Sequence, residues 1–226
     1  MRQGTLYVVA TPIGNLKDIS LRALEVLKEV DLIAAEDTRH TKILTNHYDI
    51  KTPLTSYYEH NKITKGDYLI RSLKRGEDIA LVSDAGTPGI SDPGAHIINL
   101  AIKNGISIVG IPGATAFVLG LVLSGLPTDK FAFEGFLSSK SAARRKRLSQ
   151  FKGERRTIIF YESPHRILKT LSDIREVLGD IKISIMRELT KKFEEVLRDK
   201  VSALIEHFSK TKPRGEFLVV LNPREP

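Results

Sequence analysis

The stretch that most constrains this chain is the long loop Ser83–Gly94, which reads S-D-A-G-T-P-G-I-S-D-P-G. The segment before it, Asp78–Val82, predicts a short buried strand, and Ala95–Lys103 after it has the apolar spacing of a helix. A strand-to-helix loop lies where α/β sheets place their ligands. Its glycines let a ligand approach the main chain, and its prolines restrict φ. Because a plain turn needs only about two to five residues, this length favours a binding role over simple chain reversal.

The rest of the first half alternates strand and helix patterns. Strands are predicted at Thr5–Ala10, Asp31–Ala35 and Ile106–Ile111, and helices at Ile19–Val30 and Asn61–Arg75. This alternation predicts an α/β fold with a parallel, doubly wound sheet. The loops that follow its strands are expected at one edge, in the crevice where such folds bind small molecules.

The character of the chain changes after Gly125, where short strand patterns continue without long glycine-rich loops. We therefore predict two α/β domains, 1–118 and 119–226, with a ligand cleft between them. Strands in the second domain are predicted at Phe131–Phe136, Arg156–Tyr161, Ile181–Met186, Glu194–Arg198 and Glu216–Leu221. Helices are predicted at Ser141–Phe151, from after Arg166 to about Leu178, and at Val201–Phe208.

Composition narrows the class of protein. The 226 residues, 41% of them hydrophobic, suffice for one large or two small domains. There is no apolar run near 18 residues and no signal-peptide pattern, so neither a membrane span nor secretion is expected. The absence of cysteine excludes disulfides and thiolate chemistry, and it fits a cytoplasmic protein. No Walker motif, no G-x-G-x-x-G and no metal-binding histidine spacing occurs, so we expect neither nucleotide-triphosphate chemistry nor a metal.

Most of the formal net charge of +8 sits in one segment. Between Ser138 and Arg156 there are eight basic residues against Glu154 alone, and Arg144–Arg147 form an unbroken basic run. Four consecutive helical side chains point all around the axis, and no acid lies at i±4 to pair them. Such a run repels itself unless an anion covers it. A nucleic acid backbone is the favoured anion, and a polycarboxylate substrate would also serve. The predicted RNA-binding residues are Lys140, Arg144, Arg145, Lys146 and Arg147.

The long loop closely resembles the signature of one branch of the tetrapyrrole methylase superfamily, the small-subunit ribosomal RNA cytidine-2′-O-methyltransferases. Five further stretches resemble that branch in the same order, so the resemblance covers essentially the whole chain. They are V-A-T-P-I-G-N-L-K-D-I-S (9–20), A-A-E-D-T-R-H-T (34–41), I-P-G-A-T-A (111–116), F-Y-E-S-P-H-R (160–166) and R-E-L-T-K-K-F-E-E (187–195).

The resemblance implies S-adenosylmethionine as cofactor, folded into a cleft between two α/β domains, and a homodimer. It implies 2′-O-methylation of a cytidine in small-subunit (16S) ribosomal RNA near the decoding centre, with ribosomal RNA or the small subunit as partner. Two alternatives stay open: methylation of a polycarboxylated tetrapyrrole, and a non-catalytic RNA-binding assembly factor. The cofactor contacts implied motif by motif are Pro12, Gly14, Asp84, Gly86, Thr87, Thr115, Ala116, Tyr161, Glu188 and Leu189.

The catalytic candidates follow the strand at Asp31–Ala35. Glu36, Asp37 and Arg39 crowd its end, on the edge where the glycine-containing loops are expected. We assign Arg39 to an RNA phosphate or the reacting ribose, and Asp37 or Glu36 to orienting the nucleophile or accepting its proton. The competing interpretation is structural: Asp37 and Arg39 pair with each other, or Asp37 caps the next helix.

Overall fold

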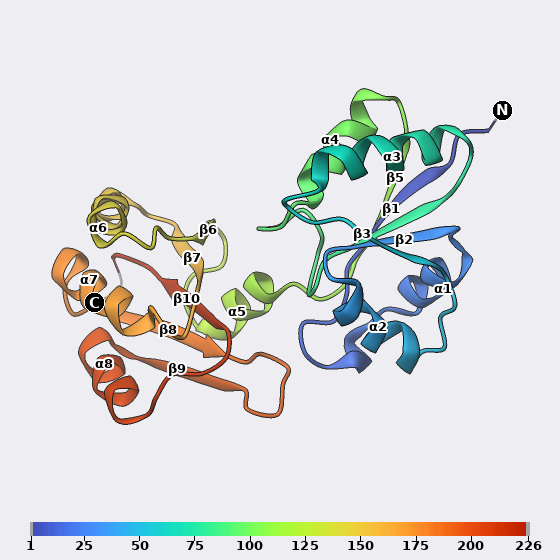
Figure 1. Cartoon of the computed structure of the whole chain (residues 1–226). Coiled ribbons are helices and arrows are strands. Elements are labelled where there is room, and N and C mark those ends of the chain that lie inside the picture. The colour runs from blue at the N-terminus through green and yellow to red at the C-terminus, as the bar shows by residue number, and fades with distance from the viewer. Residues whose placement is uncertain (1, 225–226) are drawn as a thin grey trace. The chain divides into compact units, whose positions relative to one another are not determined.

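The structure is a computed structural model that describes residues 2–224. The chain divides into two compact units, Met1–Thr115 and Ala116–Pro226 (Figure 1). The division therefore falls after Thr115, whereas the sequence placed the domain boundary after residue 118. Each unit has its own sheet and its own apolar core.

The first unit is built on five strands that all run parallel, as the alternation of elements predicted. Their order across the sheet is β3-β2-β4-β1-β5, so the strand before the long loop lies at the centre. All the loops that follow these strands therefore leave from the same edge. The strands are β1 Thr5–Val9, β2 Leu32–Ala35, β3 Leu54–Ser56, β4 Ile79–Val82 and β5 Ser107–Ile111.

Helices cover both faces of this sheet (Figure 1). Along β4, Ile79 and Leu81 pack with the residues of α3 and α4, while Ala80 and Val82 pack with those of α1 and α2. The period of two that separates these residues sends alternate side chains to opposite faces. The expected doubly wound arrangement is thus present. The helices are α1 Leu21–Glu29, α2 Thr38–His47, α3 Lys62–Lys74 and α4 Gly94–Lys103, with a short 3₁₀ turn, η1, at Leu16–Asp18.

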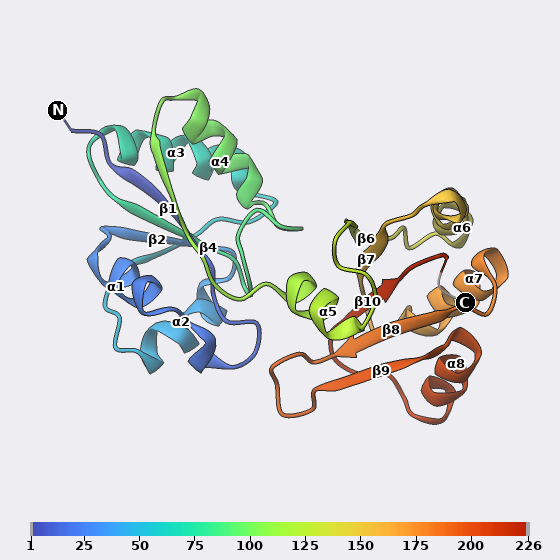
Figure 2. The same cartoon turned by 180° about the vertical axis from the view of Figure 1, so that it is seen from behind.

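The second unit contains a mixed sheet in the order β6-β7-β10-β8-β9 (Figure 2). Only β6 and β7 are parallel, and the other neighbours are antiparallel. The strands are β6 Phe131–Phe136, β7 Thr157–Glu162, β8 Lys182–Arg187, β9 Glu195–Lys200 and β10 Phe217–Leu221. The helices are α5 Ala116–Ser124, α6 Ser141–Gln150, α7 Ile167–Leu178 and α8 Val201–Lys210, with a 3₁₀ turn, η2, at Phe151–Gly153.

Strand register brings several loops of the second unit to one edge of its sheet. Phe217 at the start of β10 is paired with Glu162 on one side and with Arg187 on the other. Arg187 in turn is paired with Glu195 at the start of β9. The end of β7, the β8–β9 loop and the segment before β10 therefore share this edge. Within residues 2–224, no helix is both long and apolar enough to cross a membrane.

Candidate active site

Backbone hydrogen bonds join the loop after β1 to the long loop after β4. The Thr11 N–H donates to the Gly86 carbonyl at 2.9 Å, and the Gly86 N–H donates back to the Thr11 carbonyl at 3.0 Å. The Thr11 hydroxyl also donates to the carbonyl of Ser83 at 3.3 Å. Gly86 has φ of +83°, a conformation that favours glycine because other residues place a Cβ in a strained position. These bonds hold the two loops as one surface.

The loop after β5 joins the same surface through threonine hydroxyls. The Thr87 and Thr115 hydroxyl oxygens lie 2.7 Å apart, and the Thr87 hydroxyl donates to the Ala114 carbonyl at 3.4 Å. The three glycine-containing loops that the sequence placed at one edge are therefore in contact there. Six of the predicted cofactor residues belong to these loops: Pro12, Gly14, Asp84, Gly86, Thr87 and Thr115.

The two aspartates of the long loop have different surroundings. The Asp92 carboxylate accepts hydrogen bonds from the Gly89 N–H at 2.8 and 2.9 Å and from the Gly94 N–H at 2.7 Å, so it braces the loop from within. Asp84 is exposed, and one of its carboxylate oxygens accepts the Asp37 N–H at 3.0 Å. Asp84 is thus the aspartate of this loop that faces outward, where a ligand can reach it.

Glu36 lies half-buried beside Asp84 at the end of β2. Its carboxylate accepts the Asp84 N–H at 3.3 Å. Burial raises the pKa of the Glu36 carboxyl; the hydrogen bond from Asp84 opposes the rise, and the charges of Asp84, Asp92 and Asp37 add to it. A carboxylate in such a setting binds a proton more readily than an ordinary glutamate, which is what a general base needs.

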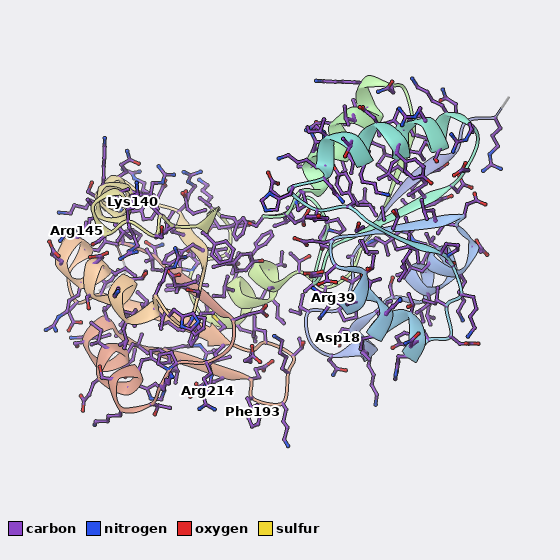
Figure 3. The ribbon with its side chains drawn as sticks, viewed as in Figure 1. Asp18, Arg39, Lys140, Arg145, Phe193 and Arg214 are labelled. Atoms are coloured by element: carbon purple, nitrogen blue, oxygen red, sulfur yellow. The ribbon has the colours of Figure 1, made fainter. Side chains whose placement is uncertain are left out.

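Asp37 and Arg39 adopt the arrangement that the structural interpretation described. Asp37 is the N-cap of α2 and accepts the Arg39 N–H at 2.8 Å. Its carboxylate also pairs with the Arg39 guanidinium at 2.7 Å, and this contact holds the pKa of Asp37 well below its usual range. The Arg39 side chain is itself 89% exposed and projects from the start of α2 (Figure 3). Asp37 is therefore a weaker proton acceptor than Glu36.

The candidates of the second unit lie at the loop-bearing edge of its own sheet. Tyr161, near the end of β7, packs its ring against Phe133 and Phe136, with centroids 5.1 and 5.5 Å away, and burial raises the pKa of its phenol. Glu188 follows β8 with φ of +52°, and Leu189 beside it is buried. The remaining candidate, Ala116, is the first residue of α5.

Three of the four residues of the basic run on α6 are paired by acids from elsewhere in the second unit, so the expectation that the run stands unpaired is wrong for all but Lys146. Arg144 is 2% exposed and binds Asp173 of α7, with its Nε 2.8 Å from Oδ2. Because its guanidinium is buried, Arg144 is withdrawn as an RNA contact. Two of its neighbours are paired at the surface, Arg145 with Glu176 at 2.9 Å and Arg147 with Glu134 at 2.7 Å. Lys140, Arg145, Lys146 and Arg147 remain predicted RNA contacts, and the first two are labelled in Figure 3.

Comparison with known proteins identifies the family. The sequence profile of the family described as Tetrapyrrole (Corrin/Porphyrin) Methylases matches residues 5–205. The chain belongs to this family. The match confirms the resemblance read from the loop motifs and makes the chain a methyltransferase, so the alternative of a non-catalytic assembly factor falls away.

Two relatives of this methylase carry the same name. A protein of Halalkalibacterium halodurans named Ribosomal RNA small subunit methyltransferase I is 52% identical over 219 residues, covering 97% of this chain and 76% of that protein. A protein of the same name from Thermotoga maritima is 49% identical over 222 residues, covering 98% of this chain and 100% of that protein.

Solved structures confirm the methylase fold. Diphthine synthase matches with a TM-score of 0.76 at 18% identity, covering 96% of this chain and 90% of that one. Uroporphyrin-III-C-methyltransferase from Thermus thermophilus matches with a TM-score of 0.68 at 21% identity, covering 98% and 96%. At these identities the likeness concerns the fold alone.

One feature of the methylase that the sequence analysis did not assign is the buried carboxylate of Glu162. It accepts hydrogen bonds from Ser163 N–H at 2.7 Å, Arg166 Nε at 2.8 Å and Thr170 Oγ1 at 2.6 Å. This network anchors the end of β7 next to Tyr161. The glutamate and arginine of F-Y-E-S-P-H-R were the available signal: Glu162 ends β7 and Arg166 precedes α7, and the turn between them brings their side chains together.

Proposed function

We propose that this methylase transfers a methyl group from S-adenosylmethionine to the 2′ hydroxyl of a cytidine in small-subunit ribosomal RNA, near the decoding centre. The observation that carries the proposal is the identity of about half the residues, along nearly the whole chain, to proteins named for methylation of that RNA. The alternative substrate, a polycarboxylated tetrapyrrole, draws on the description of the wider family and on fold likeness to solved structures at 21% identity or less.

The linked loops of the first unit supply the kinds of group that this cofactor requires. S-adenosylmethionine brings a methyl group bonded to a positively charged sulfur, together with a ribose, an adenine and an amino acid end. The exposed Asp84 carboxylate offers an acceptor for hydroxyl or amino groups, and Gly86, buried with both its backbone groups bonded to Thr11, fixes the shape of the loop that carries Asp84. A related solved structure, a uroporphyrin-III C-methyltransferase of Thermus thermophilus, is described as complexed with S-adenyl homocysteine. The resemblance adds Ala116, Tyr161, Glu188 and Leu189 as contacts.

Glu36 is the residue that we assign to accept the proton of the ribose hydroxyl. A ribose hydroxyl is a poor nucleophile, and a positioned base contributes a factor of about 100 to 10,000. The raised pKa of Glu36 brings its basicity closer to that of an effective base at neutral pH. Asp37 then serves as the cap of α2 and holds Arg39, whose exposed guanidinium is available to an RNA phosphate. This assignment requires Glu36 to come within about 2.6–3.2 Å of the hydroxyl, or one water away.

The substrate side of the proposal includes the exposed cations of α6. Lys140 and Lys146 are exposed, and within residues 2–224 no acidic side chain is ion-paired with either of them. Cations in this position neutralise backbone phosphates without reading sequence. We further propose, from the resemblance, that the enzyme acts in the cytoplasm and that it is a homodimer. Light scattering of the purified protein tests the homodimer.

The deciding experiment uses small ribosomal subunits from cells that lack this protein. The subunits are incubated with the purified enzyme and S-adenosylmethionine carrying a heavy methyl group, and the RNA is mapped by nuclease digestion and mass spectrometry. The proposal predicts one heavy methyl group on the ribose of a cytidine. A heavy methyl group on a base, or none on the RNA while a tetrapyrrole is methylated, contradicts it.

A further inference from the structure

The loop between β8 and β9 presents an aromatic side chain to solvent. Phe193 is 67% exposed, and the Nζ of Lys192 lies 5.6 Å from the centroid of its ring. Figure 3 shows Phe193 on this loop, away from the body of the second unit's sheet. A single exposed apolar residue is ordinary on a protein surface, so what distinguishes this one is the structure that holds it and the charges around it.

The loop is held by hydrogen bonds rather than left loose. Glu188 and Thr190 both have positive φ, 52° and 66°, which residues with side chains rarely adopt. The Thr190 N–H donates to the Glu194 carboxylate at 2.6 Å, and the Glu194 N–H donates to the Lys191 carbonyl at 3.1 Å. These bonds span the turn that carries Phe193, so the ring is displayed from a braced loop.

A second segment, residues 212–216, is tied to the β8–β9 loop. The Glu216 N–H donates to Glu188 Oε1 at 3.0 Å, and the Lys191 ammonium bridges Glu188 and Glu216 at 3.1 and 2.8 Å. Gly215 has φ of +85°, and a Cβ there would lie 2.5 Å from the Glu188 side chain, so this close approach requires glycine. These contacts join the segment that carries Lys212 and Arg214 to the β8–β9 loop.

The acidic side chains of the two segments are engaged in bonds, whereas three of the basic ones are not ion-paired with any described residue. Glu188 and Glu216 are engaged with Lys191, and Glu194 is engaged with the backbone of its own turn. In the part of the chain that the structure describes, no acidic side chain is ion-paired with Lys192, Lys212 or Arg214. The acids therefore brace the two segments, whereas Lys192, Lys212 and Arg214 are exposed to solvent.

An exposed aromatic ring with one cation against it, and further unpaired cations on the adjoining segment, fits single-stranded nucleic acid. Bases stack on aromatic side chains whatever their sequence, and cations beside the ring contact the backbone phosphates. A protein partner fits less well, because protein interfaces centre on apolar residues and are depleted in lysine. We infer that an unpaired base of the RNA substrate stacks on Phe193 while Lys192, Lys212 and Arg214 contact its phosphates. This inference rests on the proposed function and adds an RNA contact on an element other than α6.

The chain has no tryptophan, so Phe193→Trp introduces a single fluorescent reporter at the proposed platform. Titration with a short single-stranded cytidine oligonucleotide should quench this fluorescence, because a stacked base contacts the indole. An oligonucleotide of the same length with abasic riboses should bind through its phosphates without comparable quenching. Ile102→Trp is the matched control, since Ile102 is 61% exposed in the last turn of α4 in the other unit, and it should show no quenching.

Affinity measurements complete the test. Phe193→Ala should weaken binding of the cytidine oligonucleotide by about fivefold to 100-fold, and Phe193→Tyr should restore it. The loss for Phe193→Ala should persist at high salt, whereas replacing Lys192 and Arg214 with glutamine should flatten the salt dependence. Equal quenching by the abasic oligonucleotide, or unchanged affinity of Phe193→Ala, overturns the inference. A Phe193→Ala defect seen with intact subunits but absent with naked RNA also overturns it, and assigns the ring to a ribosomal protein.

The same preparations separate this inference from the proposed function. Wild-type enzyme that methylates small subunits, combined with a Phe193→Trp variant that is not quenched, removes only the stacking platform. Wild-type enzyme that leaves the RNA unmethylated removes the proposed function, whatever the fluorescence shows.

Discussion

Removing the carboxylate of Asp173 should destabilise the second unit strongly, because it leaves a buried guanidinium without its counter-ion. Arg144 and Asp173 have side chains only 2% and 9% exposed, and they meet through Arg144 Nε at 2.8 Å and Nη2 at 2.5 Å. The Ser141 hydroxyl donates to the same carboxylate at 2.9 Å. In Asp173→Ala these donors lose their acceptor inside the protein, where water cannot replace it.

The expected loss is about 3–5 kcal/mol of unfolding free energy, the range for breaking one partner of a buried pair. For a chain of this size that corresponds to a Tm lower by about 6–20 °C. Urea unfolding followed by circular dichroism measures the free energy, and a thermal scan measures the Tm. The double variant Arg144→Met with Asp173→Leu should recover most of the loss, because well-packed apolar residues replace a buried pair at little net cost.

Glu176→Ala is the matched control on the same helix. It removes the acid that pairs with Arg145, but both side chains of that pair are largely exposed, at 41% and 60%. Stability should change little, since water and salt already screen an exposed pair. If Asp173→Ala were as stable as Glu176→Ala, the burial of Arg144 would be refuted and its guanidinium would return as a candidate RNA contact.

Three further predictions concern function. Glu36→Gln should lower single-turnover methyl transfer by about 100-fold or more, while cofactor affinity measured by calorimetry stays within about twofold. The same variant should raise the Tm at neutral pH. The reason is that a raised folded-state pKa makes the charged form of Glu36 destabilising above that pKa. Asp37→Asn should lower the Tm at pH 7, and the difference from wild type should vanish as pH falls through the acid range, since a depressed pKa stabilises only the ionised form. Full turnover by this variant supports the capping role of Asp37. A loss of turnover with an unchanged Tm contradicts that role. Replacing Lys140 and Lys146 with glutamine should flatten the salt dependence of RNA binding without changing cofactor affinity, and an identical salt slope would show an ordinary solvated helix face.

The sequence predicted the first sheet well because its strands and helices have clear and different periods. Asp78–Val82 and Ile106–Ile111 differ from the observed β4 and β5 by a residue at their first positions. In the first unit, the helix that was not predicted is α2 at Thr38–His47, which is polar through its first turns and buries only Thr41, Leu44 and Thr45. Its apolar stripe is too narrow for a periodic signal, and its clearest local sign was the capping aspartate Asp37.

The ion pairs of α6 could not be predicted from local spacing. Arg144 finds Asp173 on α7, and Arg147 finds Glu134 on β6, so the partners depend on how distant segments pack. A search at i±4 examines only one helix and therefore suggested that the run was unpaired. The different roles of Glu36 and Asp37 were hidden for the same reason, because burial beside Asp84 and capping of α2 are properties of the folded chain.

We propose that the linked loops bind the cofactor and that Glu36 accepts the proton when a ribose of small-subunit ribosomal RNA is methylated. The most direct test of this proposal is mass mapping of that RNA after incubation of unmodified subunits with wild-type enzyme or with Glu36→Gln, in the presence of labelled S-adenosylmethionine. The account predicts one labelled cytidine ribose with wild-type enzyme and a large loss of label with the variant, while the variant still binds the cofactor. Full labelling by Glu36→Gln would contradict the assigned base, and label on any group other than a ribose hydroxyl would contradict the account as a whole.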